Sequence, residues 1–187
     1  ANMRNIRLII VLGVVYIDML GIGLAYPILP KLIEHFEHGD ITHASYIFGF
    51  LASGFALGHG GVFVVQPPYL LFYADKNHDD IPDGPPEVLL SGFGMEDSHA
   101  LANSLTWGPD GWLYGAQGST VTAKIRGIEF QQGIWRFHPI THEFELFCEG
   151  GGNSWGLDFD RHGDLLYSTN VGGFTMLHGV QGGYYWK

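Results

Sequence analysis

The sequence predicts a mainly β protein, a partial β-propeller of two to three four-stranded blades, preceded by an N-terminal transmembrane helix. Three observations support this fold class. A long apolar run stands near the start, a glycine-plus-strand phrase recurs every fifty or so residues, and short apolar strands alternate with glycine-rich turns in the second part. The boundary falls near Leu57. Residues 1–57 are therefore interpreted as a membrane segment with its loop, and residues 58–187 as an incomplete propeller.

The first predicted element is a membrane-spanning helix. Residues 8–29 contain one charged residue, Asp18, and this stretch is long enough to cross a bilayer, which needs about 20 apolar residues. Arg4 and Arg7 precede it and favour a cytoplasmic N-terminus. A carboxylate that faces lipid is costly, so we expect Asp18 to face a protein interior or an aqueous cavity. We therefore expect residues 6–29 to hold the chain in a membrane.

Other interpretations of this apolar region stay open. It also fits an uncleaved signal anchor, or a signal peptide with the small residues at 23–25 as its cleavage site. A second apolar stretch, residues 44–57, is too short to span a bilayer, but it becomes long enough if it continues to Val65. That continuation would use residues that otherwise form the first predicted strand.

The end of the first apolar run carries a family resemblance. The string Asp18-Met-Leu-Gly-Ile-Gly-Leu-Ala-Tyr-Pro27-Ile-Leu-Pro30 resembles the first transmembrane helix of major facilitator superfamily transporters, especially drug/proton antiporters. The resemblance covers residues 3–57 and implies a transport role for Asp18. Members of that family carry about twelve such helices, so this one helix cannot form a transport pathway alone.

The second part of the chain is organised by a repeat. A phrase of a glycine followed by an apolar strand occurs three times, as Gly61-Val-Phe-Val-Val, Gly111-Trp-Leu-Tyr-Gly and Gly163-Asp-Leu-Leu-Tyr. The copies begin 50 and 52 residues apart (111 − 61 and 163 − 111), close to the period of propeller blades. Two of these glycines close a tight turn after a preceding strand, which predicts hairpins. A propeller needs typically four to eight blades to close, so further blades are expected in a complete relative.

The expected strands follow from this repeat. One whole four-stranded blade is predicted between about Ser104 and Glu149. Three strands precede it, and two clear strands with two weaker ones follow it. The flanking predictions are 61–66, 69–74 and 87–91 before this blade, and 156–160, 164–169, 173–177 and 182–186 after it.

Charge and cysteine content exclude several functions. The net charge is −10, of which only −1 lies in residues 1–57. An acidic, glycine-rich segment has no basic stripe that could follow a phosphate backbone, so nucleic acid is not expected as a partner. The single cysteine, Cys148, excludes an internal disulfide and the Cys-x-x-Cys-His attachment of a c-type haem, so the chain has no haem motif. We expect Cys148 to be a buried strand residue.

A second resemblance suggests a chemistry. The resemblance is carried by four strings: Gly60-Gly-Val-Phe-Val, Pro67-Pro-Tyr-Leu-Leu-Phe, Leu90-Ser-Gly-Phe-Gly and Asn103-Ser-Leu-Thr-Trp-Gly-Pro-Asp-Gly-Trp-Leu-Tyr-Gly115. They resemble the membrane-bound dehydrogenases of planctomycetes and related bacteria. These are propellers akin to the glucose/sorbosone dehydrogenases that use pyrroloquinoline quinone, often with a c-type haem module further along. The resemblance covers residues 60–187. It implies a small sugar or alcohol substrate and a propeller on the periplasmic side of the membrane.

The same resemblance implies two site residues. His99, ahead of the Gly-Pro-Asp turn, corresponds to the histidine that acts as general base on the substrate alcohol. Asn153 corresponds to the asparagine of an Arg-Asn pair whose arginine polarises a quinone oxygen. Here Gly152 replaces that arginine, so an important electrophilic contact for pyrroloquinoline quinone is missing.

An acidic loop predicts a calcium site. Asp75, Asn77, Asp79 and Asp83 occupy positions 1, 3, 5 and 9 of the loop, and the carbonyl of Ile81 stands at position 7, as calcium loops require. The loop departs from the usual pattern at two positions, as Asp80 replaces the turn glycine at position 6 and Pro86 stands at position 12. A solvated acidic turn between two strands is the alternative.

Three functional hypotheses remain. The chain is part of a membrane-associated quinoprotein-like dehydrogenase, or the start of a transporter fused to a foreign segment, or a non-catalytic binding propeller. Two unrelated family segments meet near residues 57–60, which is also what a misassembled reading frame would produce. Because the propeller is incomplete, we expect no enzymatic activity from this chain alone. The tryptophans of the second part are expected to pack between blades, with sugar stacking as the alternative.

Overall fold

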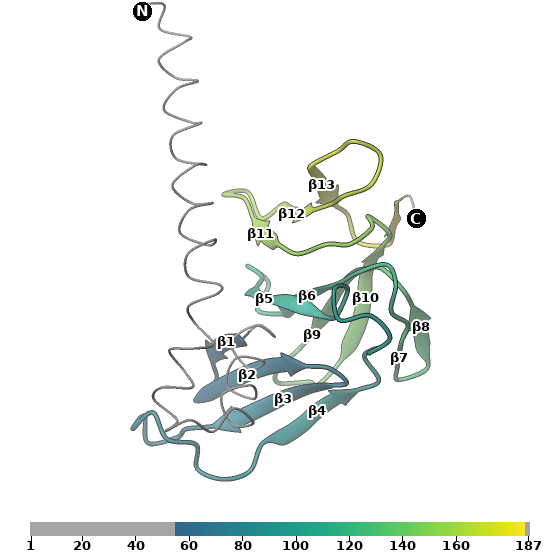
Figure 1. The fold of residues 1–187 in the computed structure, drawn as a ribbon. Helices are drawn as coiled ribbons and strands as arrows, with labels where there is room; N and C mark the ends of the chain where they lie inside the picture. Colours follow the sequence, from purple (N-terminus) through teal and green to yellow (C-terminus); the bar gives the residue numbers. More distant parts are fainter. Residues whose placement is uncertain (1–54, 186–187) are drawn as a thin grey trace, which may run out of the picture. The chain divides into compact units, whose positions relative to one another are not determined.

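The computed structural model describes residues 55–185, which form a mainly β structure (Figure 1). Fourteen strands in four sheets make up this part of the chain. Within it, no helix has the length and apolar character that crossing a membrane requires. The helix predicted at residues 6–29, and Asp18 within it, lie outside the described residues.

The first sheet is an antiparallel meander in chain order. The sequence predicted its last three strands, and the structure adds a strand in front of them. A two-residue turn of His59 and Gly60 joins the first two strands, and their φ angles of 53° and 72° are the positive values that a type I′ hairpin turn requires. The strands are β1 (Phe55–Gly58), β2 (Gly61–Gln66), β3 (Tyr69–Ala74) and β4 (Glu87–Ser91).

The added strand moves the start of the sheet-forming part. β1 pairs Phe55 with Val64 and Leu57 with Val62, so residues expected in the transporter-like segment belong to the first sheet. The sheet-forming part therefore starts before residue 58. Because residues 55–65 form two antiparallel strands, the alternative in which the second apolar stretch continues as a helix to Val65 is wrong.

The second sheet contains the four strands predicted between Ser104 and Glu149, and it also takes up a fifth. A short hairpin, which the sequence analysis did not predict, is inserted between its second and third strands. Cys148 lies buried in its fourth strand, as predicted. The sheet has the order β14-β10-β9-β6-β5, with strands β5 (Asn103–Trp107), β6 (Leu113–Gln117), β9 (Gly133–Phe137), β10 (Phe144–Glu149) and β14 (Gly183–Tyr184), and the hairpin is β7 (Ala123–Ile125) and β8 (Ile128–Phe130).

The third sheet has three strands, β11 (Leu157–Phe159), β12 (Leu165–Ser168) and β13 (Met176–Gly179). The strand predicted at 182–186 is present as the shorter β14, but it does not join these three strands. β14 instead pairs in parallel with β10 of the second sheet, with Cys148 opposite Gly183 and Glu149 opposite Tyr184.

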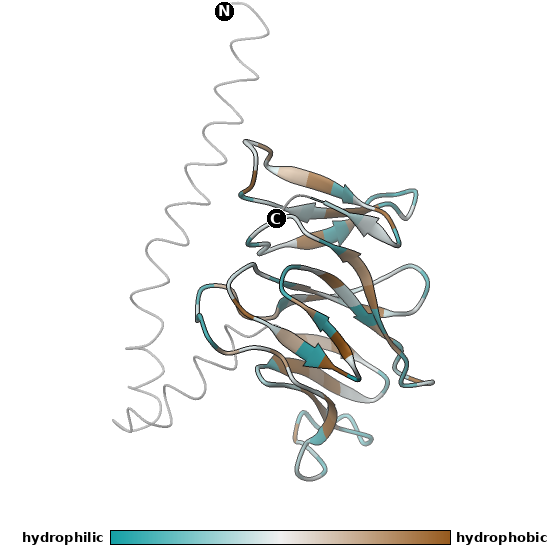
Figure 2. Cartoon of the chain, turned by 90° about the vertical axis from the view of Figure 1, so that its right-hand side faces the viewer, coloured by the Kyte–Doolittle hydropathy of each residue, from teal (hydrophilic) through white to brown (hydrophobic). Residues whose placement is uncertain are grey.

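Two apolar layers hold the sheets together. Between the first and second sheets lies the larger cluster, with Phe63, Leu70, Trp135 and Phe137 among its buried members. A smaller cluster, which includes Tyr114, Ile134 and Tyr167, lies between the second and third sheets. Figure 2 shows brown, hydrophobic segments mainly along the strands.

The strand registers define two ends of these sheets. We call the end with Gln66, Ser91, Asn103, Gln117 and Glu149 the upper end, and the end with Gly58, Trp107 and Phe137 the lower end. The first strands of the three sheets lie side by side, since Trp107 Nε1 donates to the carbonyl of Leu57 at 2.7 Å and Thr106 Oγ1 to that of Leu157 at 3.4 Å. The loops that join one sheet to the next therefore gather at the upper end.

Candidate functional site at the upper end of the sheets

His99 lies in the loop between the first and second sheets. Its side chain is 90% exposed, and its Nδ1 lies 3.2 Å from Oδ1 of Asp97. The same carboxylate oxygen accepts the backbone N–H of His99 at 2.9 Å, so a short turn fixes the two residues together. With the proton on Nδ1 donated to Asp97, Nε2 is free to accept a proton, as a general base requires.

Asn153 lies in the next loop, between the second and third sheets, and it reaches His99. Its Nδ2 donates to the carbonyl oxygen of His99 at 2.8 Å, and Trp155 Nε1 donates to the same oxygen at 3.0 Å. Gly118 permits this approach, because a Cβ at that position would collide with Oδ1 of Asn153. The structure thus brings together the two site residues predicted from separate motifs, although Asn153 touches the backbone of His99 and not its ring.

Asp97 is held from a third loop. Thr120 Oγ1 donates to Oδ2 of Asp97 at 2.5 Å. This hydrogen bond and the one from the backbone N–H of His99 lower the pKa of the Asp97 carboxyl below its ordinary value. These bonds therefore favour the ionised form of Asp97, which is the form that accepts them.

Sequence reasoning missed Asp97, Thr120 and the role of Trp155. The acidic residue two positions before His99 was a usable signal, because Asp side chains at that spacing bond to the backbone two residues on. Trp155 was expected to pack between blades. It is 49% exposed at the rim, whereas Trp135 is fully buried.

Gly152 stands where the dehydrogenase resemblance implies an arginine, and the site has no room for one. The φ angle of Gly152 is +74°, a left-handed value that side-chain-bearing residues rarely adopt. A Cβ there would collide with Val171 Cγ2 and lie 2.5 Å from Asn170 Oδ1. The N–H of Gly152 donates to the buried Gln132 Oε1 at 2.7 Å, which anchors this backbone. The described residues therefore do not fit pyrroloquinoline quinone at the position of its expected arginine contact.

The acidic loop predicted to bind calcium lies at the lower end, since β4 separates it from the loop of His99. Asp75 accepts the backbone N–H groups of Asp79 at 3.2 Å and Asp80 at 3.1 Å. Asp80 has a φ of 64°, the conformation that a glycine usually supplies at position 6. In the described part of the chain, no three His, Cys, Asp or Glu side chains converge closely enough to hold a metal ion.

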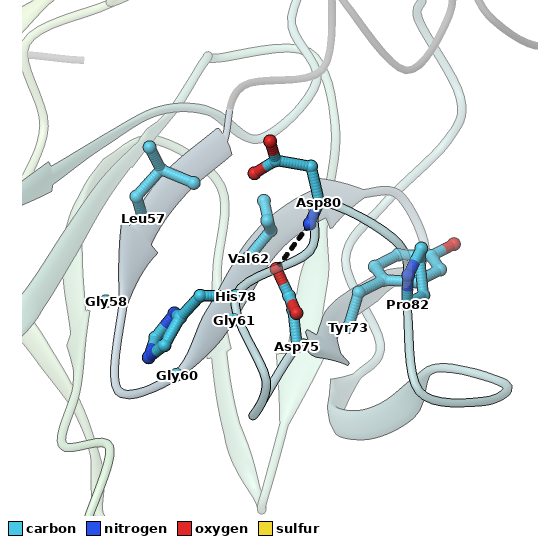
Figure 3. Close-up of a pocket in the computed structure, with 10 residues that line it drawn as sticks. All are labelled: Leu57, Gly58, Gly60, Gly61, Val62, Tyr73, Asp75, His78, Asp80 and Pro82. Carbon is cyan, nitrogen blue, oxygen red and sulfur yellow. Dashed lines mark hydrogen bonds between the residues drawn. The ribbon is translucent and has the colours of Figure 1, made fainter.

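The ligands of the calcium prediction are held by local hydrogen bonds. Asn77 Nδ2 donates to Asp79 at 2.9 Å, and Asp79 Oδ1 accepts the N–H of Ile81 at 2.9 Å. Asp83 accepts the N–H of Lys76 at 2.9 Å. A cavity of about 480 Å³ lies beside this loop, and Figure 3 shows Asp75 bonded to the N–H of Asp80 at its edge.

The fold and this geometry define a mainly β domain whose inter-sheet loops converge on an exposed histidine. Residues 50–184 match the family model described as Domain of unknown function (DUF7133), and the chain belongs to that family. The match starts ahead of β1 and includes every strand that the structure describes. A comparison with curated proteins finds no match.

Proposed function

We propose that the sheets of this chain are consecutive blades of a β-propeller. Three features support this: the meander order of the sheets, the repeat spacing near fifty residues, and the side-by-side first strands. In such an arrangement the loops at one end of the blades surround the central axis. The upper end of this chain is then the rim at which a small molecule binds.

We further propose that this rim binds a small sugar or alcohol, as in the quinoprotein-like dehydrogenases that the sequence resembles, with His99 as general base. The observation that carries the proposal is the convergence of His99, Asp97 and Asn153 from two loops. His99 Nε2 accepts the hydroxyl proton, Asp97 stabilises the imidazolium, and Asn153 with Trp155 fixes the loop backbone. The exposed indole of Trp155 offers a stacking face for a sugar ring.

Oxidation of the alcohol also requires a hydride acceptor. The acceptor that the resemblance implies, pyrroloquinoline quinone, would lack its arginine contact at Gly152. We expect the chain alone to show no alcohol oxidation when quinone and calcium are added. Measured dye reduction under those conditions, lost in a His99→Gln variant, would show that this expectation is wrong.

The binding step can be tested without turnover. The full chain in a zwitterionic detergent is titrated with D-glucose while the ring resonances of its histidines are followed by NMR. We expect the His99 signal to shift with saturation and the shift to weaken in Asp97→Asn, because the imidazole loses its anchor. His138 serves as the internal control. A His99 signal that does not respond would contradict a sugar site at this rim.

A non-catalytic binding propeller is the second candidate. The backbone at Gly152 leaves no room for an arginine side chain, which favours this second candidate. A rim without that electrophilic contact can still bind a polyol. Calorimetric titration of D-glucose into the unmodified chain and into the His99→Gln variant separates the two candidates, because it does not depend on the His99 signal. Unchanged sugar affinity in the variant would mean that His99 does not contact the sugar, which favours binding without catalysis.

We also propose that the loop of Asp75, Asn77, Asp79, Ile81 and Asp83 binds calcium. The left-handed Asp80 and the two N–H groups that Asp75 accepts support it. Thermal unfolding in calcium should occur at a higher temperature than in chelator, and Asp79→Asn should remove the difference. Asp158→Asn, an exposed residue on β11, is the matched control.

We also propose a location for the chain, at a membrane with its sheets on the periplasmic side. Residues 6–29 would anchor it and the sheets would lie in the periplasm, where further blades or a c-type haem module would complete the enzyme. Protease added to intact spheroplasts should cleave the loop of Asp75 if the sheets are outside. Protection of that loop would favour the transporter interpretation or a cytoplasmic domain.

A further inference from the structure

A second cavity lies at the lower end, between the second and third sheets. Its volume is about 420 Å³, within the range of roughly 300–1,000 Å³ typical of small-molecule sites. Strands β6, β9 and β10 supply one wall and β11 to β13 the other. None of its lining residues belongs to the upper rim or to the acidic loop.

Arg136 forms the polar side of this cavity, and its charge is already neutralised. Its side chain is only 11% exposed, and it pairs with Asp110 at 3.0 Å and with Glu145 at 2.7 Å. Its guanidinium also stacks 4.3 Å from the ring of Trp112 and donates to Tyr114 Oη at 3.0 Å. Two carboxylates around one guanidinium leave this wall with a net negative charge, which disfavours anionic ligands.

The opposite wall carries exposed polar groups that have hydrogen-bonding capacity left for a ligand. Asp164 and His178 have side chains that are 56% and 54% exposed, and their closest approach is 3.4 Å. Gln181 donates to Glu145 at 3.3 Å, which leaves its carbonyl oxygen as an acceptor. The cavity therefore presents both donors and acceptors at its edge.

The floor between these polar walls is apolar. Phe147 and Phe159 both line the cavity, and each meets the buried ring of Tyr114 edge to face, at 5.2 and 4.9 Å between centroids. Leu165 and Val180 extend the same surface. An apolar floor bordered by carboxylate, guanidinium and amide groups matches a sugar ring, whose faces carry C–H groups and whose hydroxyls project from its edge.

We propose that this lower cavity is a binding site for a neutral saccharide, separate from the rim at His99. The apolar floor takes the C–H face of the ring, and Asp164, Gln181 and the Asp110–Arg136 pair take its hydroxyls. The negative wall selects a neutral sugar over a sugar acid. This site holds a saccharide without chemistry and does not depend on the role proposed for His99.

One titration tests this site separately from the upper rim. The full chain in zwitterionic detergent is titrated with cellobiose and, separately, with glucuronate, while the ring signal of His178 reports on the lower cavity and that of His99 on the rim. We expect cellobiose to shift His178 with saturation and glucuronate to bind at least about tenfold more weakly. Equal or tighter binding of glucuronate, or no response of His178 to either sugar, overturns the proposal whatever His99 does.

A variant adds a second criterion. Asp164→Ala should weaken the cellobiose response of His178 about tenfold, the effect of losing one charge-assisted hydrogen bond. Asp158→Ala on the neighbouring strand β11 is the matched control, because this residue is exposed and does not line the cavity. A control that weakens binding as much as Asp164→Ala also overturns the proposal. The comparison of the two sugars stands even if a variant fails to fold.

Discussion

The two layers between the sheets differ in character, although the same strands supply both. On β9, Trp135 and Phe137 enter the layer shared with the first sheet, while Ile134 belongs to the layer shared with the third. The first layer is apolar and rich in aromatic rings. The second contains Tyr114 and the paired Arg136, and it leaves a cavity at its lower end. Because side chains alternate along a strand, the second sheet packs closely against the first sheet on one face and borders a cavity on the other.

The largest expected effect lies in the layer between the first and second sheets. Trp135→Ala should lower the free energy of unfolding by about 3–5 kcal/mol, because the side chain is fully buried and packs against Phe93 at 5.0 Å between ring centroids. Trp155→Ala, at an exposed rim position, should cost less than about 1 kcal/mol. Urea unfolding of the full chain in zwitterionic detergent measures both. Equal losses would mean that the first layer is not the main source of stability.

We expect the second layer to be sensitive to substitution at its upper end, where the loop of Gly152 meets the third sheet. Gly152→Arg should destabilise the chain by about 1–3 kcal/mol more than Gly173→Arg, and it should not create quinone binding. Both glycines have positive φ, +74° and +77°, but a Cβ at 173 meets nothing within 4 Å, whereas one at 152 collides with Val171. Comparing the two urea midpoints isolates the steric part. A Gly152→Arg variant as stable as Gly173→Arg would show that the loop opens easily.

The repeat explains why the central sheets could be predicted from sequence. Turn glycines such as Gly111 and Gly163 follow short apolar strands, and local turn chemistry of this kind needs no long-range information. β1 was missed because Phe55–Leu57 continues an apolar run that also suits a membrane segment. The partner of β14 could not be predicted, because its parallel pairing with β10 depends on a contact about 35 residues away in sequence, which no local pattern encodes.

The site was predictable only in part, for a similar reason. His99 and Asn153 were found through resemblance, but their contact depends on two loops that meet because the sheets pack. Thr120 is held beside Asp97 by the turn after β6, and such a contact between separate loops has no periodic signature. Gly152 was recognised as a departure. Only the structure shows that its backbone conformation excludes a side chain.

The polar part of the second layer should respond to alkaline pH. Burial raises the pKa of Tyr114 to about 12. Since its value in the unfolded chain is about 10, the stabilisation is complete below about pH 10 and is lost as the pH rises toward 12. The urea midpoint should therefore fall between about pH 10 and pH 12, and Tyr114→Phe should flatten that part of the profile. An unchanged slope in the variant would assign the loss to other groups.

The smallest expected effect lies at the rim, where Asp97 is partly exposed and its carboxylate is bonded to Thr120 and to the backbone N–H and ring of His99. Thr120→Val removes the largest of the causes that lower the pKa of Asp97, so that pKa should rise toward its ordinary value. A carboxyl group whose pKa is lowered in the folded state stabilises the fold at pH values above that pKa. In the variant, this stabilisation should therefore be lost at a higher pH as the solution is acidified. Carboxyl NMR titration measures the shift. Asp160 is an internal control, because backbone N–H groups of Asp164 and His162 lower its pKa and Thr120 does not touch it. If both pKa values moved together, the change would reflect loosening of the whole domain, and the rim would not be an independent, locally anchored unit.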